Sequence, residues 1–192
     1  MFARIEYKKY GPLIFISHLD LIRTWERIAR RARLPVAFTE GFHPKPKFSF
    51  IPPLPVGFEG ERELLDIKII ETSPDIKDMV NSVTPEGIWV NSVEIIANSD
   101  LSKIIIGASY DFKWIGELAE KTLKEKLTTI GLMEWSYSFK NLDKNTGENL
   151  LSLDILFSSK EITPKKVVDL IEGLGYIRWV RLSRRALLKR LP

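Results

Sequence analysis

The sequence predicts an α+β protein made of two tandem ferredoxin-like (βαββαβ) units with antiparallel sheets, over residues 1–98 and residues 99–192. Segments that alternate like strands and segments with helical periodicity follow one another in the same order in both halves. Two expected helix starts, Ser73 and Thr163, are each followed by proline and occupy the same place in their halves. The halves share no sequence identity, so the expected repeat is one of pattern.

The elements expected in the first half are, in order, a strand at 2–8, a helix from Ser17, extended pieces at 36–38 and 47–51, a strand at 63–71, a helix from Ser73 and a strand at 88–96. The first helix has the clearest start, because Ser17 is a favourable N-cap and Asp20 follows three residues later. Apolar residues then recur at helical spacing as far as Ala32 and predict a buried face. Pro35 is expected to end this helix, because proline disfavours helical backbone in the preceding residue.

The elements expected in the second half are, in order, a strand at 104–114, a helix at 116–129, a strand at 134–140, a strand-to-strand hairpin connection at 143–147, a strand at 150–157, a helix at 163–174 and a strand at 176–182. The connection at 143–147 is expected from its composition, Asp-Lys-Asn-Thr-Gly. The remaining tail, from Arg184 to Pro192, is expected to form a short basic helix.

Composition narrows the class of protein. The chain has 192 residues, of which 44% are hydrophobic and 28% charged, as in ordinary globular proteins. No stretch approaches the roughly 20 apolar residues of a membrane span, and no signal peptide is recognisable. We therefore expect a cytoplasmic protein without a membrane partner. With no cysteine and only two histidines, no metal site or cofactor is expected in this chain.

Positive charge is concentrated in two segments of a chain whose net charge is only +4. Residues 17–47 contain seven Lys or Arg against three acidic residues, and residues 176–192 contain six Lys or Arg and no acid. The remainder is net negative. Such segregation favours a localised basic surface, which is typical of nucleic-acid-binding proteins.

The candidate nucleic-acid-binding residues lie in these two segments. Guanidinium groups on the first helix suit phosphate, because they donate in a planar fork. Phenylalanines alternate with cations after Gly41, and aromatic rings among cations are typical of single-stranded nucleic-acid surfaces. The candidates are Arg23, Arg27, Arg30, Arg31, Phe42, His43, Lys45, Lys47, Arg184 and Arg185. Two simpler interpretations stay open. In one, the arginines form a solvated helix face in which Asp20 and Glu26 pair with some of them, and in the other, Phe48 and Phe50 pack into the core.

A polar site is a second candidate. His18 falls at the first position of the expected helix, where free backbone N–H groups attract anions. The acidic run that contains Glu63 and Asp66 follows later in the chain, and the candidate polar site is His18, Asp20, Glu63 and Asp66. Alternatively, the acidic run pairs with the arginines of the first helix and reduces the free positive surface.

Residues 15–69 resemble the start of the radical SAM-linked protein family. The family pattern has an S-H-L-D opening, an arginine-rich helix, an L-P-x-x-x-S-x-G-F-N-P-H-P-K segment, P-L-P-V-G and an E-x-x-D-I strand. The matching positions are Ser17, His18, Leu19, Asp20, Gly41, Phe42, Pro44, Pro46, Lys47, 53–57, Glu63 and Asp66. The chain departs from the pattern at Thr39, His43 and Lys45. The resemblance implies a radical SAM partner and RNA as the target.

The expected function is that of a non-catalytic accessory protein, which binds RNA (tRNA or rRNA) and presents it to a radical SAM partner for RNA modification. A radical SAM cluster needs cysteine thiolates, so this chain is not expected to be the radical enzyme. One alternative is a docking module for that enzyme without RNA contact. Another is a metal-independent RNA endonuclease, by fold analogy with the repeat-processing endonucleases of CRISPR systems. His18 would then be the general base, with Arg23, Lys45 or Lys47 stabilising the transition state.

Overall fold

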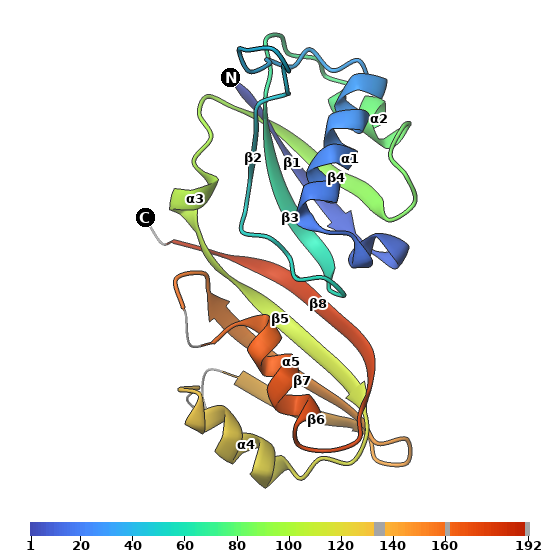
Figure 1. Cartoon of the computed structure of the whole chain (residues 1–192), viewed down its shortest axis with the longest axis vertical. Coiled ribbons are helices and arrows are strands. Elements are labelled where there is room, and N and C mark those ends of the chain that lie inside the picture. The colour runs from blue at the N-terminus through green and yellow to red at the C-terminus, as the bar shows by residue number, and fades with distance from the viewer. Residues whose placement is uncertain (133–136, 160–161, 191–192) are drawn as a thin grey trace. The chain divides into compact units, whose positions relative to one another are not determined.

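The structure is a computed structural model that describes residues 1–132, 137–159 and 162–190. The described residues form eight strands, mostly antiparallel, five α-helices and one 3₁₀ helix, so the protein is a mixed α/β protein (Figure 1). The chain divides into two compact units, Met1–Ile105 and Ile106–Pro192. This division falls a few residues after the expected boundary at 98/99. None of the described helices combines the length and the apolar character that crossing a bilayer requires.

Unit 1 contains β1 (Phe2–Lys9), η1 (Gly11–Phe15), α1 (His18–Arg31), β2 (Phe48–Phe50), β3 (Glu59–Lys68), α2 (Ile76–Asn81), β4 (Ile88–Ile96) and α3 (Leu101–Ile104). Strand β1 lies between β4 and β3, and β2 pairs with the other edge of β3. All of these pairings are antiparallel. Helices α1 and α2 lie on the same side of these strands (Figure 1).

The core of unit 1 lies between this sheet and its helices. Alternate residues of β1 face inward, beginning with Ala3 and Ile5, and they pack with Leu65 and Ile67 of β3. Trp25 of α1 is fully buried against them, and its ring meets the Tyr7 ring edge-on with 4.9 Å between centroids. The even-numbered residues of β1 therefore point to the other face of the sheet.

Helix α1 begins where the sequence predicts and ends earlier. The Ser17 hydroxyl oxygen accepts a hydrogen bond from the Asp20 backbone N–H at 3.1 Å, which confirms the N-cap. The helix ends at Arg31, because Arg33 has a positive φ of 50° and the Leu34 N–H turns back to the Ala29 carbonyl. Pro35 therefore follows the end of the helix without causing it.

Helix α2 begins later than expected. Ser73 does not cap it, because its hydroxyl oxygen accepts from the Asp75 N–H at 3.3 Å in a turn that precedes the helix. Helix α5 of unit 2, in contrast, begins as predicted, since the Thr163 side chain accepts from the Lys166 N–H at 3.3 Å. The difference is local, because only Thr163 lies directly before the first helical residue.

Unit 2 contains β5 (Ile105–Ile115), α4 (Glu120–Thr129), β6 (Tyr137–Asp143), β7 (Glu148–Leu156), α5 (Pro164–Glu172) and β8 (Arg178–Lys189). Its strands are ordered β8-β5-β7-β6. Phe112 and Trp114 of β5 are fully buried, and so are Leu123 of α4 and Val167 of α5. The strand expected at 134–140 is observed from Tyr137, and residues 134–136 lie outside the described part of the chain.

The prediction of a basic helix in the C-terminal tail is wrong. Strand β8 continues through Arg184 as far as Lys189, beyond the expected end at Leu182. The physical reason is pairing: β8 lies beside β5, and the backbone hydrogen bonds of a sheet outweigh the modest helical preference of a short basic segment.

Candidate nucleic-acid interface

The exposed side of α1 presents four arginines. Arg23, Arg27, Arg30 and Arg31 are all exposed, opposite the buried face that contains Trp25. At 1.5 Å of rise per residue, Arg23 and Arg27 are about 6 Å apart along the helix axis. The arrangement is a row of guanidinium groups along one edge of a rigid helix.

Only Arg23 of this row has an acidic partner among the described residues. Its Nη1 lies 3.0 Å from Asp20 Oδ1, and the two side chains are 65% and 53% exposed, so the pair contributes little to stability. The Ser17 hydroxyl, and then Arg23, lower the pKa of Asp20. Within residues 1–132, 137–159 and 162–190, the other three arginines of the row form no ion pair. They are therefore available to an anionic ligand.

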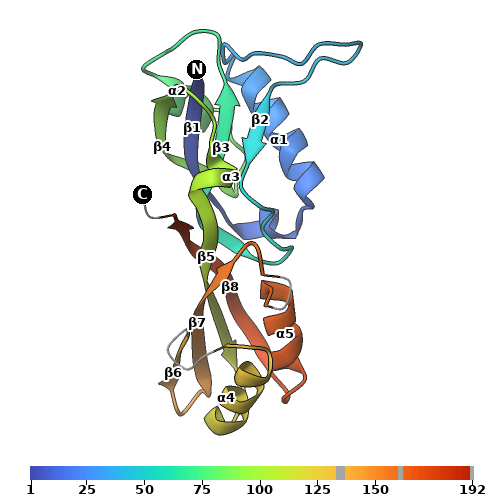
Figure 2. The same ribbon diagram turned by 90° about the vertical axis from the view of Figure 1, so that its left-hand side faces the viewer.

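The segment 37–47 after α1 folds back on itself, and we call it the hairpin loop. The Lys47 N–H donates to the Ala37 carbonyl at 3.0 Å, and the Thr39 N–H donates to the Lys45 carbonyl at 2.8 Å. The Lys45 N–H in turn donates to the Thr39 hydroxyl at 3.0 Å. Figure 2 shows the segment between α1 and β2 reaching away from the other elements of unit 1. Its base is closed and its tip is held out in solvent.

The tip of the hairpin loop carries the predicted aromatic residue. Phe42 is 101% exposed, and His43 beside it is also exposed. The Lys45 ammonium lies 3.9 Å from Glu26 Oε1, which connects the loop to α1. Lys47 is exposed as well. The predicted loop residues and the α1 arginines thus lie in the same unit, and the Lys45–Glu26 pair is a contact between the two segments.

Phe48 and Phe50 behave differently from Phe42. Both are partly buried and pack against the core of unit 1, with 5.9 Å between their ring centroids. This confirms the expectation that they serve packing. Within the loop, Phe42 is the fully exposed phenylalanine, whereas Phe38 is 44% exposed.

The four residues of the predicted polar site are not brought together. Glu63 pairs in register with Tyr7 and therefore lies on the helix-facing side of the sheet, whereas Asp66 pairs with Arg4 on the other side. Asp20 remains exposed on α1. The physical reason is strand periodicity, because residues three apart point to opposite faces.

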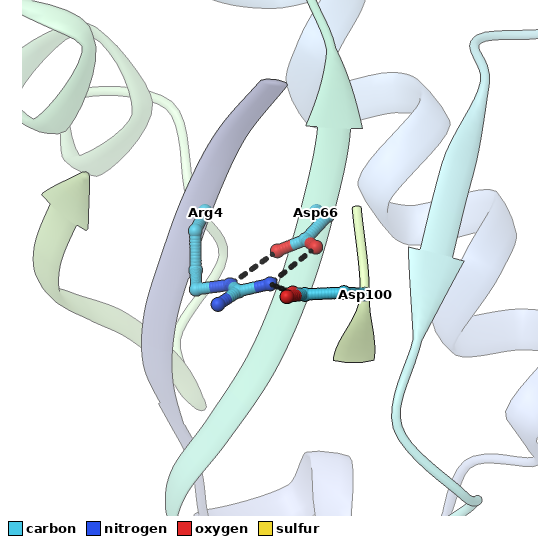
Figure 3. A network of polar contacts seen from close by, with 3 residues as sticks. All are labelled: Arg4, Asp66 and Asp100. Carbon is cyan, nitrogen blue, oxygen red and sulfur yellow. Dashed lines mark hydrogen bonds and ion pairs between the residues drawn. The ribbon is translucent and has the colours of Figure 1, made fainter. Parts of the chain in front are cut away.

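Asp66 is held by Arg4, as Figure 3 shows. The Arg4 Nε and Nη2 atoms donate to the two Asp66 carboxylate oxygens at 2.8 and 2.9 Å, and Nη2 also donates to Asp100 Oδ1 at 2.8 Å. The Asp66 hydrogen bonds raise the pKa of Arg4 above its usual value, and Arg4 lowers the pKa of Asp100. Arg4 pairs with the Asp66 carboxylate on the face of the sheet away from α1, so Asp66 does not neutralise the α1 arginines.

His18 lies in a different setting, at the start of α1. Its ring packs edge-on against Phe50, with 5.4 Å between centroids. Burial lowers the pKa of His18, and the positive charge of Lys9 lowers it further. The imidazole is therefore neutral near pH 7 and can accept a proton.

Lys9 is the neighbour of His18 that sequence reasoning missed. It is only 2% exposed and occupies the last position of β1. A signal was present, because alternation from Ala3 through Tyr7 assigns Lys9 to the inward face, where lysine is unusual. Glu63 lies close to the same end of the sheet. Gly60 is the register partner of Lys9, and a Cβ atom added to Gly60 would lie only 2.5 Å from Glu63 Cγ.

The setting of His18 predicts a pH-dependent stability. The pKa of His18 is lowered in the folded protein, so below about pH 6.5 the unfolded chain binds a proton that the folded chain resists. The free energy of unfolding is therefore expected to fall between pH 7 and pH 5, and His18→Gln should remove part of that fall. Urea unfolding at several pH values measures it. The same pH dependence in both proteins would contradict the assignment.

The predicted C-terminal candidates differ from each other. Arg184 is only 1% exposed, and its guanidinium carbon lies 5.9 Å from the centroid of the Phe157 ring. It is not a surface residue, because β8 continues as a strand and turns this side chain inward. Arg185 is 51% exposed, and its Nε lies 3.4 Å from Asp111 Oδ2. Of these two arginines, only Arg185 remains available at the surface.

The described residues contain no group of three or more His, Asp or Glu side chains arranged to hold a metal ion. A search of curated proteins finds no match to this chain. Residues 3–170 match the model of the family DUF2344, which is described as an uncharacterized protein conserved in bacteria. Because this match spans most of the chain, the protein belongs to the DUF2344 family.

Proposed function

We propose that the protein is a non-catalytic accessory protein that binds RNA through α1 and the hairpin loop. The observation that carries the proposal is the combination of three α1 arginines, which have no ion-pair partner among the described residues, with the fully exposed Phe42 in the same unit. Guanidinium groups bind phosphates, and an exposed aromatic ring stacks on bases. Neither feature has a role in the described core.

The strand order supports a finer proposal for the fold. In each unit, the fourth strand lies beside the first, the first beside the third, and the third beside the second. A helix follows the first strand and another follows the third. This is the βαββαβ arrangement, so we propose two tandem ferredoxin-like units, a plan that RNA-binding proteins often use.

The proposed partner is a radical SAM enzyme, to which the protein presents tRNA or rRNA in the cytoplasm. The support is the resemblance of residues 15–69 to the radical SAM-linked family. These 192 residues contain no cysteine, so they do not supply the thiolates that the iron–sulfur cluster of such an enzyme needs. The division of labour assigns RNA binding to this protein and chemistry to its partner.

A gel shift tests RNA binding. Labelled small cellular RNA is mixed with the purified full chain over a salt series with EDTA, and the same samples are run again under denaturing conditions. We expect a shift of intact RNA that weakens as salt rises, because phosphate contacts release counterions. No shift at low salt would overturn the proposal. Co-purification with a radical SAM enzyme that survives nuclease treatment and is lost in Phe42→Ala would then favour the docking module.

One observation favours a second candidate, a metal-independent RNA endonuclease. His18 is neutral near pH 7 and lies close enough to Lys9 for the lysine charge to lower its pKa. A neutral imidazole is the form that would take the proton of a 2′-hydroxyl group. The denaturing gel distinguishes this candidate: it requires shortened RNA in the presence of EDTA and intact RNA with His18→Ala.

A further inference from the structure

The tip of the hairpin loop has the properties of a stacking platform for a single base. We infer that Phe42 stacks on one unpaired nucleotide, while the α1 arginines and Lys47 hold the neighbouring phosphates. The ligand class is therefore single-stranded RNA or RNA with an unpaired base. This inference deepens the proposed function and rests on it.

The first argument is the exposure of Phe42. At 101%, its ring is as open to water as in an extended chain. Phenylalanine gains free energy by leaving water, and the core of unit 1 accepts Phe48 and Phe50 nearby. The backbone around Phe42 instead holds the ring away from that core. Both faces of the ring are open to a ligand.

The second argument is the closed base of the loop. Three hydrogen bonds join its two arms, and Phe38 and Pro46 form an isolated antiparallel bridge. Gly41 has a φ of 118°, which other residues rarely adopt, and it turns the chain immediately before Phe42. An arm closed in this way loses little conformational freedom when it binds, which favours affinity.

The third argument is charge. Lys47 is exposed on one arm, and Lys45 is tied to α1 by Glu26 at 3.9 Å. The loop that carries the aromatic tip therefore contacts the same helix that carries Arg27 and Arg30. A base on the ring and phosphates on the cations together make the pattern of single-strand recognition.

The stacking geometry decides between paired and unpaired RNA. In a duplex, both faces of each base are covered by its neighbours, so a single protruding ring cannot stack on it. An unpaired base leaves its face free. A protein surface is a poorer ligand for the tip, because Phe42 is followed by His43, Pro44 and Lys45, and a protein interface needs a larger apolar centre.

Fluorescence anisotropy tests the inference with the full chain and three RNAs. The probes are a labelled single-stranded 12-mer, the same 12-mer annealed to its complement, and that duplex with one bulged base. We expect the single strand and the bulged duplex to bind at least tenfold more tightly than the perfect duplex. Phe42→Ala should weaken the first two by roughly 5- to 150-fold and leave the perfect duplex nearly unchanged.

Matched variants separate stacking from hydrophobicity. Phe42→Tyr should retain binding because it keeps an aromatic face, whereas Phe42→Leu should behave like Phe42→Ala. Phe15→Ala is the control, because Phe15 is 70% exposed in η1, ahead of α1, and should have no effect. A 2-aminopurine base at the unpaired position should be quenched by the wild type and not by Phe42→Ala.

The outcomes distinguish this inference from the proposed function. Equal affinity for all three RNAs, or unchanged binding by Phe42→Ala, would overturn the stacking role and leave RNA binding by α1 in place. Rescue by Phe42→Leu would overturn stacking in favour of a hydrophobic contact. No binding to any of the three RNAs would overturn the proposed function, and the inference with it.

Discussion

Replacing Arg27 and Arg30 together by Ala is expected to weaken RNA binding roughly 10- to 100-fold at low salt, because two charge-assisted contacts to phosphate are lost. The dependence on salt should also change. Each phosphate contact to a single strand contributes about 0.7 to the slope of log K against log salt, so the slope should flatten by about 1.4. Anisotropy titrations at four or more salt concentrations measure both quantities.

This double variant should keep its fold. Both arginines are exposed on α1, and alanine is a strong helix former, so thermal unfolding should match the wild type. The matched control is Lys121→Ala with Lys126→Ala, which removes the same charge from exposed positions of α4. An equal loss in the control would indicate a general charge effect. An unchanged slope in the α1 variant would refute α1 as the RNA-binding surface.

Replacing Arg4 by Met is expected to lower the free energy of unfolding by about 3–5 kcal/mol. Asp66 is fully buried, and Arg4 donates to both of its carboxylate oxygens (Figure 3). Without Arg4, the carboxylate loses these two charge-assisted contacts in a site that excludes water. Urea unfolding measures the change as a shift of the midpoint at constant slope.

Two further variants test this explanation. Asp100→Asn should cost much less than Arg4→Met, because the Asp100 side chain is 45% exposed and water can replace the pair. Arg4→Met combined with Asp66→Leu should recover much of the loss, since no buried charge then remains. A loss below about 1 kcal/mol in Arg4→Met alone would show that Asp66 is satisfied without Arg4.

The features that sequence reasoning predicted correctly are local ones. The cap at Ser17 and the cap at Thr163 each depend on residues within three positions along the chain. Alternation in β1 and β5 depends only on the period of a strand, so the buried faces that contain Ile5 and Phe112 were predictable. The mixed α/β class follows from the order of these elements.

The candidate interface was partly predictable for the same reason. Helical spacing alone separates the α1 arginines from the buried stripe of Trp25 and Ile28. The glycine before Phe42 marked that residue as a loop tip, whereas Phe48 and Phe50 had the period of a strand. Their contrast in exposure could therefore be expected from composition and spacing.

Other features depend on partners far away in the sequence. Arg4 and Asp66 are 62 positions apart, and only the pairing of β1 with β3 brings them together. Alternation assigns Lys9 to the inward face, but its proximity to His18 depends on how α1 packs on the sheet. No motif within the sequence marks either contact, so the predicted polar site joined residues that the two faces of β3 separate.

The amino-acid sequence by itself determined where α1 starts, which faces of the strands are apolar, and that positive charge gathers in the α1 segment and at the C-terminal end. Only the tertiary structure decided that the tail extends a strand, that Arg184 is buried, and that Arg4 meets Asp66. The physical reason is that caps and periodicity depend on neighbours along the chain. Strand pairing and burial depend on neighbours in space, whose identity is known only once the chain has folded.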